Sequence, residues 1–108
     1  MNPQIIEEGR KNAITSYFTL IGTVIAIVSN IEKKNSYASF HIRQALGLNT
    51  LFIALAVMVS YFNDWMISSA FYVFFAVLWF FGLTNAIQCE HEPIPIVGGI
   101  FQKLFKSL

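Results

Sequence analysis

Long stretches without a charged side chain alternate with short polar segments along this chain. Three such stretches predict membrane-spanning helices over about 13–30, 44–63 and 65–89, because a helix that crosses the hydrocarbon needs about 20 mostly apolar residues. The third stretch is apolar on every side and lacks the inside–outside alternation of a barrel strand. The pattern therefore predicts helices, whose backbone hydrogen bonds are satisfied internally in lipid.

The composition favours a membrane protein over a soluble one. Apolar residues make up 56% of the 108 residues and charged residues only 12%, whereas soluble domains contain about 25% charged residues. Too little polar chain remains to cover three apolar helices in water. We therefore predict one all-α membrane domain over 1–108 with three transmembrane helices. The composition excludes a disordered chain, and a net charge of +1 gives no support for nucleic acid as a partner.

The first apolar stretch also resembles a secretory signal peptide, because Arg10 and Lys11 precede it. Its apolar region is long for a signal, and the residues at 27–29 form a poor cleavage site. We therefore expect this stretch to be a retained helix.

The distribution of Lys and Arg predicts the orientation. Three crossings place the N-terminus and the turn at 63–65 on one side, and the loop at 30–44 and the C-terminus on the other. The second side has five Lys and Arg residues against two on the first, and cytoplasmic loops carry such an excess. We expect the N-terminus to lie outside and the C-terminus to lie in the cytoplasm.

The segment after the third stretch predicts a short amphipathic helix at the membrane surface. Pro93 and Pro95 end the third helix, and two glycines follow them. Apolar residues then recur at helical spacing over about 97–107, with two lysines on the opposite face. Such a helix is suited to lie in the cytoplasmic interface, and contact with a partner helix is the alternative.

Polar side chains gather at the predicted cytoplasmic edge of the second and third helices, which a very short turn joins in an antiparallel hairpin. They are His41, Arg43, Gln44 and Asn49 on the second helix, with Asn85, Gln88, Glu90 and Glu92 at matching depth at the end of the third. One interpretation is a vestibule for a substrate, peptide or ion. The other is a hydrogen-bonded clamp that fixes the hairpin, in which Arg43 pairs with a carboxylate or extends to the interface.

No catalytic, cofactor or metal site is expected. The run from Cys89 to Glu92, taken together with His41, matches no spacing of metal ligands. No Ser-His-Asp or Cys-His arrangement is supported, and the carboxylates are few and interfacial. No charge lies at mid-membrane, which gives little support to a proton relay. The sequence therefore favours a protein that is not an enzyme.

Two motifs resemble a family of small bacterial membrane proteins often labelled import component protein. His41–Leu46 is similar to the family's H-x-R-Q-A-L signature at the head of the second helix, and Glu92–Gly98 is similar to its P-[VIL]-P-x-x-G after the last helix. That family resembles the channel-type Tic subunit of the chloroplast inner-envelope import translocon. The resemblance implies a multi-pass inner-membrane protein without known enzymatic activity. It assigns no chemical role to the matched positions, which are His41, Arg43, Gln44, Pro93, Pro95 and Gly98.

These features predict a non-enzymatic accessory or assembly subunit of a larger inner-membrane complex, such as one that moves or inserts proteins. Its partners would be the lipid bilayer and either other membrane proteins or further copies of the chain. The candidate partner face is the stripe formed by Phe71, Phe74, Phe75 and Leu78 on the third helix. Lipid contact explains that stripe equally well, because apolar residues gain little by pairing in lipid.

The alternative function is a small homo-oligomeric channel or transporter. A chain of this size would need several copies to line a path, with Asn49, Asn85 and Gln88 facing it.

Overall fold

The computed structural model describes residues 2–90 and 98–106, and in those residues it contains five α-helices and no strand. The helices are α1 (Pro3–Ser16), α2 (Thr19–Lys33), α3 (Ser36–Ser60), α4 (Trp65–Ile87) and α5 (Gly98–Leu104). Together they form an elongated body of 47 × 23 × 22 Å. The predicted all-helical fold class is confirmed in these residues.

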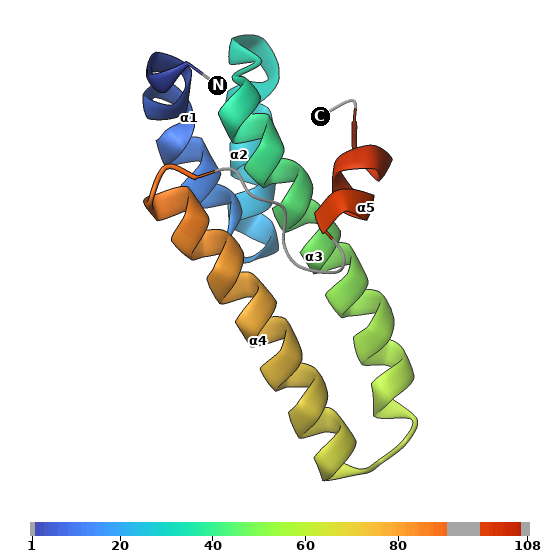
Figure 1. Ribbon diagram of the computed structural model, residues 1–108. Coiled ribbons are helices and arrows are strands. Elements are labelled where there is room, and N and C mark those ends of the chain that lie inside the picture. Colours follow the sequence, from blue (N-terminus) through green and yellow to red (C-terminus); the bar gives the residue numbers. More distant parts are fainter. Residues whose placement is uncertain (1, 91–97, 107–108) are drawn as a thin grey trace.

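Helices α3 and α4 form a long antiparallel hairpin whose turn stands away from the rest of the molecule (Figure 1). They have 25 and 23 residues, which makes them about 37 and 34 Å long. Asp64 begins α4 by accepting a hydrogen bond from the backbone N–H of Met66. By length and composition, both helices could cross a membrane.

The expected first crossing over about 13–30 is wrong, because the chain breaks in the middle of that stretch. Helix α1 ends at Ser16 and α2 begins at Thr19, whose φ of 63° lies in the left-handed region. The two helices fold back on one another, with Gly22 against the carbonyl oxygen of Thr15. Two helices in the described residues meet the length and hydropathy of a membrane span, and neither α1 nor α2 is one of them.

The expected separation of the N-terminus from the loop at 30–44 is also wrong. Because α1 and α2 form a hairpin, the start of α1 lies beside the start of α3, where Asn35 Nδ2 donates to the Ile5 carbonyl at 2.9 Å (Figure 1). The C-terminal end of α4 lies there too, since Arg10 binds the Ile87 carbonyl. We call this end of the molecule, with the starts of α1 and α3 and the end of α4, the charged end.

The Lys and Arg residues of the chain lie in the half of the molecule nearer the charged end. They are Arg10, Lys11, Lys33, Lys34, Arg43, Lys103 and Lys106, on α1, α2, α3 and α5 and directly after them. The turn between α3 and α4, at the opposite end, has a single charged residue, Asp64.

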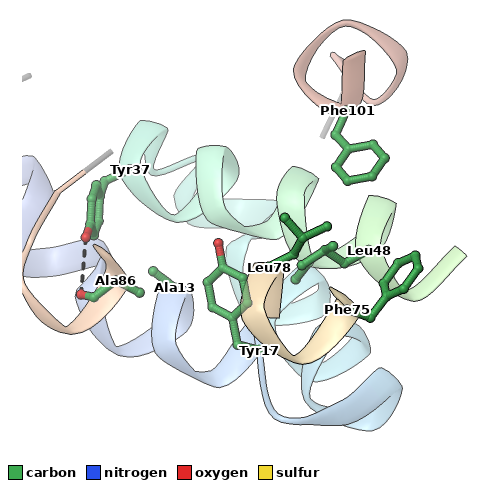
Figure 2. Packing of buried hydrophobic residues seen from close by; sticks show 9 residues of the cluster. Ala13, Tyr17, Tyr37, Leu48, Phe75, Leu78, Ala86 and Phe101 are labelled. Carbon is green, nitrogen blue, oxygen red and sulfur yellow. Dashed lines mark hydrogen bonds between the residues drawn. The ribbon is translucent and has the colours of Figure 1, made fainter. Parts of the chain in front are cut away.

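The hydrophobic core lies where α1, α3 and α4 meet, in the half of the molecule nearer the charged end. Figure 2 shows Tyr17, Leu78 and Phe75 in this core, with the Phe101 ring reaching it from α5. Phe75 and Leu78 are buried, and Phe71 stacks on Phe52 of α3. The aromatic stripe expected to face a partner therefore turns largely inward, and of its members Phe74 is the one that is exposed.

Candidate functional site

A chain of hydrogen bonds joins the buried polar side chains near the charged end. Gln44 Nε2 donates to the Tyr17 hydroxyl at 3.0 Å, and that hydroxyl lies 2.7 Å from His41 Nδ1. His41 Nε2 lies 2.8 Å from the carbonyl oxygen of Glu90. A carbonyl can only accept, so Nε2 carries a hydrogen, and in the neutral imidazole Nδ1 accepts from Tyr17. This network connects α1, α3 and the segment that follows α4.

Three aromatic rings enclose the imidazole of His41, which is fully buried. Tyr17, Tyr37 and Phe40 approach it edge-on, with ring centroids 5.5, 4.9 and 5.2 Å away. Burial raises the pKa of the Tyr17 hydroxyl above its usual range, so that group keeps its proton and remains a donor. The arrangement holds His41 in one orientation.

Side chains from α1 and α3 bind the carbonyl oxygens at the end of α4. Tyr37 Oη donates to the carbonyls of Asn85 and Ala86, both at 3.2 Å. Arg10 donates to the Ile87 carbonyl through Nε at 3.1 Å and Nη2 at 2.9 Å. The last carbonyls of a helix lack partners within it and carry partial negative charge, which suits a guanidinium.

Sequence reasoning missed Tyr17, Tyr37 and Arg10 as members of this site. Arg10 was considered only as a charge that sets the orientation, and Tyr17 lies inside a stretch interpreted as a span. The paired contacts join residues 24 to 77 positions apart, such as Tyr17 with His41 and Arg10 with Ile87. No local pattern in the sequence indicates such pairs.

Asn49 belongs to a separate contact, deeper along α3. Its Nδ2 donates to Thr23 Oγ1 of α2 at 2.8 Å. Asn85 of α4 lies beside Tyr37 of α3, whose hydroxyl binds its carbonyl. Asn49 lies about three turns, or ~18 Å, further along α3 than Tyr37. The expected matching depth of Asn49 and Asn85 is therefore wrong. Gln88 is exposed at the end of α4, so the three residues suggested to line a channel are not brought together.

Arg43 connects α3 to α5. Its Nη2 donates to the carbonyl of Lys106 at 3.0 Å and its Nη1 to Gln102 Oε1 at 3.4 Å, while Gln102 Nε2 donates back to the Phe40 carbonyl at 2.8 Å. Arg43 thus contacts α5, where pairing with a carboxylate or extension to the interface was suggested. The expected amphipathic helix is present over Gly98–Leu104, and it packs directly on α3.

Gly47 allows α5 to approach α3 closely. The Phe101 ring lies over Gly47, and a Cβ at that position would overlap the ring. Phe101 is buried, whereas Ile100 and Leu104 on the same short helix are exposed. Among the described residues of the apolar face, Phe101 is thus buried against the bundle and Phe105 is half-buried.

The substitution Phe101→Ala is expected to release α5 from α3, because the ring is the main apolar contact of this short helix. The loss of a buried phenyl ring costs about 3 kcal/mol. Limited trypsin digestion of the purified protein in detergent measures the effect as faster cleavage after Lys103. Leu104→Ala is the matched control, since Leu104 is 70% exposed. Equal cleavage rates in the two variants would contradict this docking.

The remaining described residues of the predicted cluster are divided between the network around His41 and helix α5. His41, Gln44 and Asn85 are buried and Glu90 is exposed, while Gly98 is the buried first residue of α5. Glu92, Pro93 and Pro95 lie outside the described residues. Within residues 2–90 and 98–106, no group of three or more His, Cys, Asp or Glu side chains is placed to hold a metal ion.

A groove of about 280 Å³ lies between α3 and α4, on the side of Asn49. Its lining is formed by Leu48, Asn49, Phe52, Tyr72, Phe75, Ala76 and Trp79. Trp79 uses its indole N–H for the Tyr17 carbonyl, at 2.6 Å. The groove is therefore mainly apolar, and its polar groups are partly engaged in contacts between helices.

Comparisons of the chain with protein-family models, curated proteins and solved structures find no match. The resemblance suggested by the two short motifs therefore stays a prediction. What the geometry itself supports is the clamp: the polar side chains at the charged end hold α1, α3, α4 and α5 together.

Proposed function

We propose that this chain is a multi-pass membrane protein that crosses the bilayer with α3 and α4 and acts as a non-enzymatic accessory or assembly subunit. The main support is the contrast between the polar side chains inside the helix bundle and the apolar side chains on its outside. His41, Gln44 and Asn49 make hydrogen bonds between helices, while large apolar side chains cover the outside of the hairpin. A structural polar clamp with an apolar exterior suits a protein that works by contact within a membrane.

The outer face of α4 supports its insertion in lipid. Val73, Val77 and Phe80 recur at i, i+4 and i+7 and are all exposed, as are Ile53 and Val57 on α3. An apolar surface that extends along both helices exceeds what a monomeric soluble protein exposes. The concentration of Lys and Arg at the charged end favours a cytoplasmic position for that end. The start of α1 and helix α5 would then lie on the cytoplasmic side of a bacterial inner membrane.

The proposed role is assembly with other membrane proteins, including a complex that moves or inserts proteins. The two motifs of the import component protein resemblance support this class of complex. The proposed contact surface is the stripe of Val73, Val77 and Phe80, in place of the stripe that turned inward. Helices in membranes associate by close packing, since lipid is as apolar as the side chains.

A bulky substitution on the proposed stripe distinguishes a partner from lipid. Val77→Trp is expected to abolish co-purification of membrane proteins with the tagged chain in mild detergent, because a packed interface has no room for an indole. Mass spectrometry of the captured proteins measures the loss. Val57→Trp on α3 is the matched control, since Val77 and Val57 are 62% and 55% exposed and lipid accommodates either side chain.

The outcomes separate the proposals. Capture of a defined set of proteins by the unmodified chain and by Val57→Trp, but not by Val77→Trp, supports a subunit that binds through α4. A clean monomer that captures nothing in any form contradicts the accessory role. Equal capture by both variants contradicts the proposed face.

A further inference from the structure

The turn between α1 and α2 has its backbone carbonyls bound by the rest of the protein. Thr23 Oγ1 donates to the Ser16 carbonyl at 2.7 Å, and Trp79 Nε1 donates to the Tyr17 carbonyl at 2.6 Å. The Phe18 carbonyl accepts from the backbone N–H of Gly22 at 3.0 Å. A turn in water needs no such partners, because solvent supplies them. In hydrocarbon, irregular backbone is tolerated only where the protein satisfies it.

The side chains of this turn are unlike those of a turn in water. Phe18, Leu20 and Ile21 are exposed at its tip, where a solvent-facing turn would present Gly, Asn, Asp or Ser. Asn49 reinforces the turn from α3, because its Nδ2 binds the same Thr23 hydroxyl that reaches the Ser16 carbonyl. The tip thus presents apolar side chains outward together with Thr19, while the carbonyls of Ser16 and Tyr17 are bound on the inner side.

An apolar stripe continues from the tip along α2. It consists of Ile21, Val24, Ile25, Val28 and Ile31, all exposed, and it ends at Lys33 and Lys34. Helix α2 has 15 residues and is about 22 Å long, whereas the hydrocarbon core is about 30 Å thick. The stripe is therefore too short to cross the hydrocarbon core. Helix α2 packs beside α3.

The depth of the hairpin along α3 agrees with a partial insertion. Its tip is level with Asn49, and its open end is level with Asn35, as the contacts of Thr23 and Ile5 show. The remainder of α3 and the first half of α4 extend beyond the tip (Figure 1). The exposed charges of α1 are Glu7, Glu8, Arg10 and Lys11; Glu7 and Glu8 lie in the half toward the open end, and Arg10 and Lys11 lie just past the middle of the helix.

We propose that α1 and α2 form a re-entrant hairpin, which dips into the leaflet at the charged end and returns to the same side. The acyl chains of that leaflet cover the α2 stripe from Ile21 to Val28, and its last residue, Ile31, lies at the lipid–water interface one turn from Lys34. This inference rests on the proposed insertion of α3 and α4. It makes the start of α1 and the α2–α3 connection face the same compartment, opposite the turn at 61–64.

Single-cysteine labelling in a Cys89→Ser background tests this topology. The variants are Gln4→Cys, Lys33→Cys, Tyr61→Cys, Ile21→Cys and Ile31→Cys, each treated with a membrane-impermeant maleimide in right-side-out and inside-out vesicles. Residues 4 and 33 are expected to react in the same vesicles, and residue 61 in the other kind. Residue 21 is expected to react in neither until the membrane is dissolved in denaturing detergent.

Ile31 is the matched control for Ile21, because both are exposed isoleucines on α2, at 60% and 73%, and they differ in predicted depth. Residue 31 is expected to react together with residue 33. Equal reaction at residues 21 and 31 would overturn the insertion of the tip. If residue 4 reacts in the same vesicles as residue 61, the re-entrant hairpin is contradicted and a continuous membrane-spanning helix over about 13–30 is supported.

Reconstitution separates lipid from a protein partner as the occupant of the stripe. The purified Ile21→Cys protein is placed in phosphatidylcholine vesicles, which contain no other protein. Continued protection of residue 21 supports lipid, and loss of protection contradicts it. If the chain is not an integral membrane protein at all, alkaline carbonate extracts it and residues 4, 33 and 61 react alike. That result contradicts the proposed function itself and is distinct from failure of the hairpin alone.

Discussion

Replacement of His41 by alanine is expected to lower the free energy of unfolding by about 4 kcal/mol. The substitution removes a fully buried ring that contacts three aromatic side chains, and a cavity of that kind costs about 3–5 kcal/mol. It also removes the hydrogen-bond partner of the Tyr17 hydroxyl and of the Glu90 carbonyl. Thermal unfolding of the purified protein in detergent, followed by circular dichroism, measures the effect.

Two further variants separate the clamp from a vestibule. Tyr17→Phe is expected to cost about 1–2 kcal/mol, because it withdraws a hydroxyl from His41 and from Gln44. Gln88→Ala, at an exposed position near the same end, is expected to stay within about 0.5 kcal/mol. In the double variant His41→Ala with Tyr17→Phe, the free energy of unfolding should fall by less than the sum of the decreases in the two single variants, because the two residues share one hydrogen bond.

The vestibule interpretation makes the opposite prediction. A histidine that binds a substrate or peptide can be removed with little loss of stability, and the effect then appears in partner capture. Unchanged unfolding of His41→Ala, together with lost co-purification, would contradict the clamp. A large loss of stability that Tyr17→Phe partly reproduces would support it.

The sequence was sufficient to predict the charge-free part of α3, α4 and the turn between them, but α3 begins at Ser36, inside the stretch at 30–44 that was expected to be a loop. Their charge-free stretches are long, and Asp64 marks the turn. The break between Ser16 and Thr19 could not be predicted in the same way, since the hydroxyl residues of that stretch are also tolerated in spanning helices. What decides the break is the binding of the Tyr17 carbonyl by Trp79, a contact across 62 positions.

The candidate site was predicted by residue type but not by partner. His41 lies beside the Glu90 carbonyl after α4, because antiparallel helices bring those ends together. The contact of His41 with Tyr17 could not be predicted from the sequence, since Tyr17 lies in a stretch expected to form a separate span. Asn85 and Gln88 share a helical face by spacing, yet α4 ends at Ile87 and leaves Gln88 exposed.

The substitution Gly22→Ala is expected to lower the free energy of unfolding by about 2 kcal/mol and to open the α1–α2 hairpin. Alanine is favoured over glycine in a helix interior by about 1 kcal/mol, so helix propensity alone predicts stabilisation. The structure predicts the reverse sign, because a Cβ on Gly22 would overlap the carbonyl oxygen of Thr15, and backbone cannot move aside as a flexible side chain can. Thermal unfolding in detergent measures the sign directly.

Gly99→Ala is the matched control, since a Cβ at Gly99 meets no atom within 4 Å and helix propensity acts there alone. We expect it to be neutral or slightly stabilising. The variant Gly22→Ala combined with Gln4→Cys also reports on topology, because relief of the overlap favours straightening the chain through Tyr17. Stabilisation by Gly22→Ala would mean that α1 and α2 do not approach closely at this point. The uninterrupted helix over 13–30 would then account better for the first apolar stretch than the hairpin does.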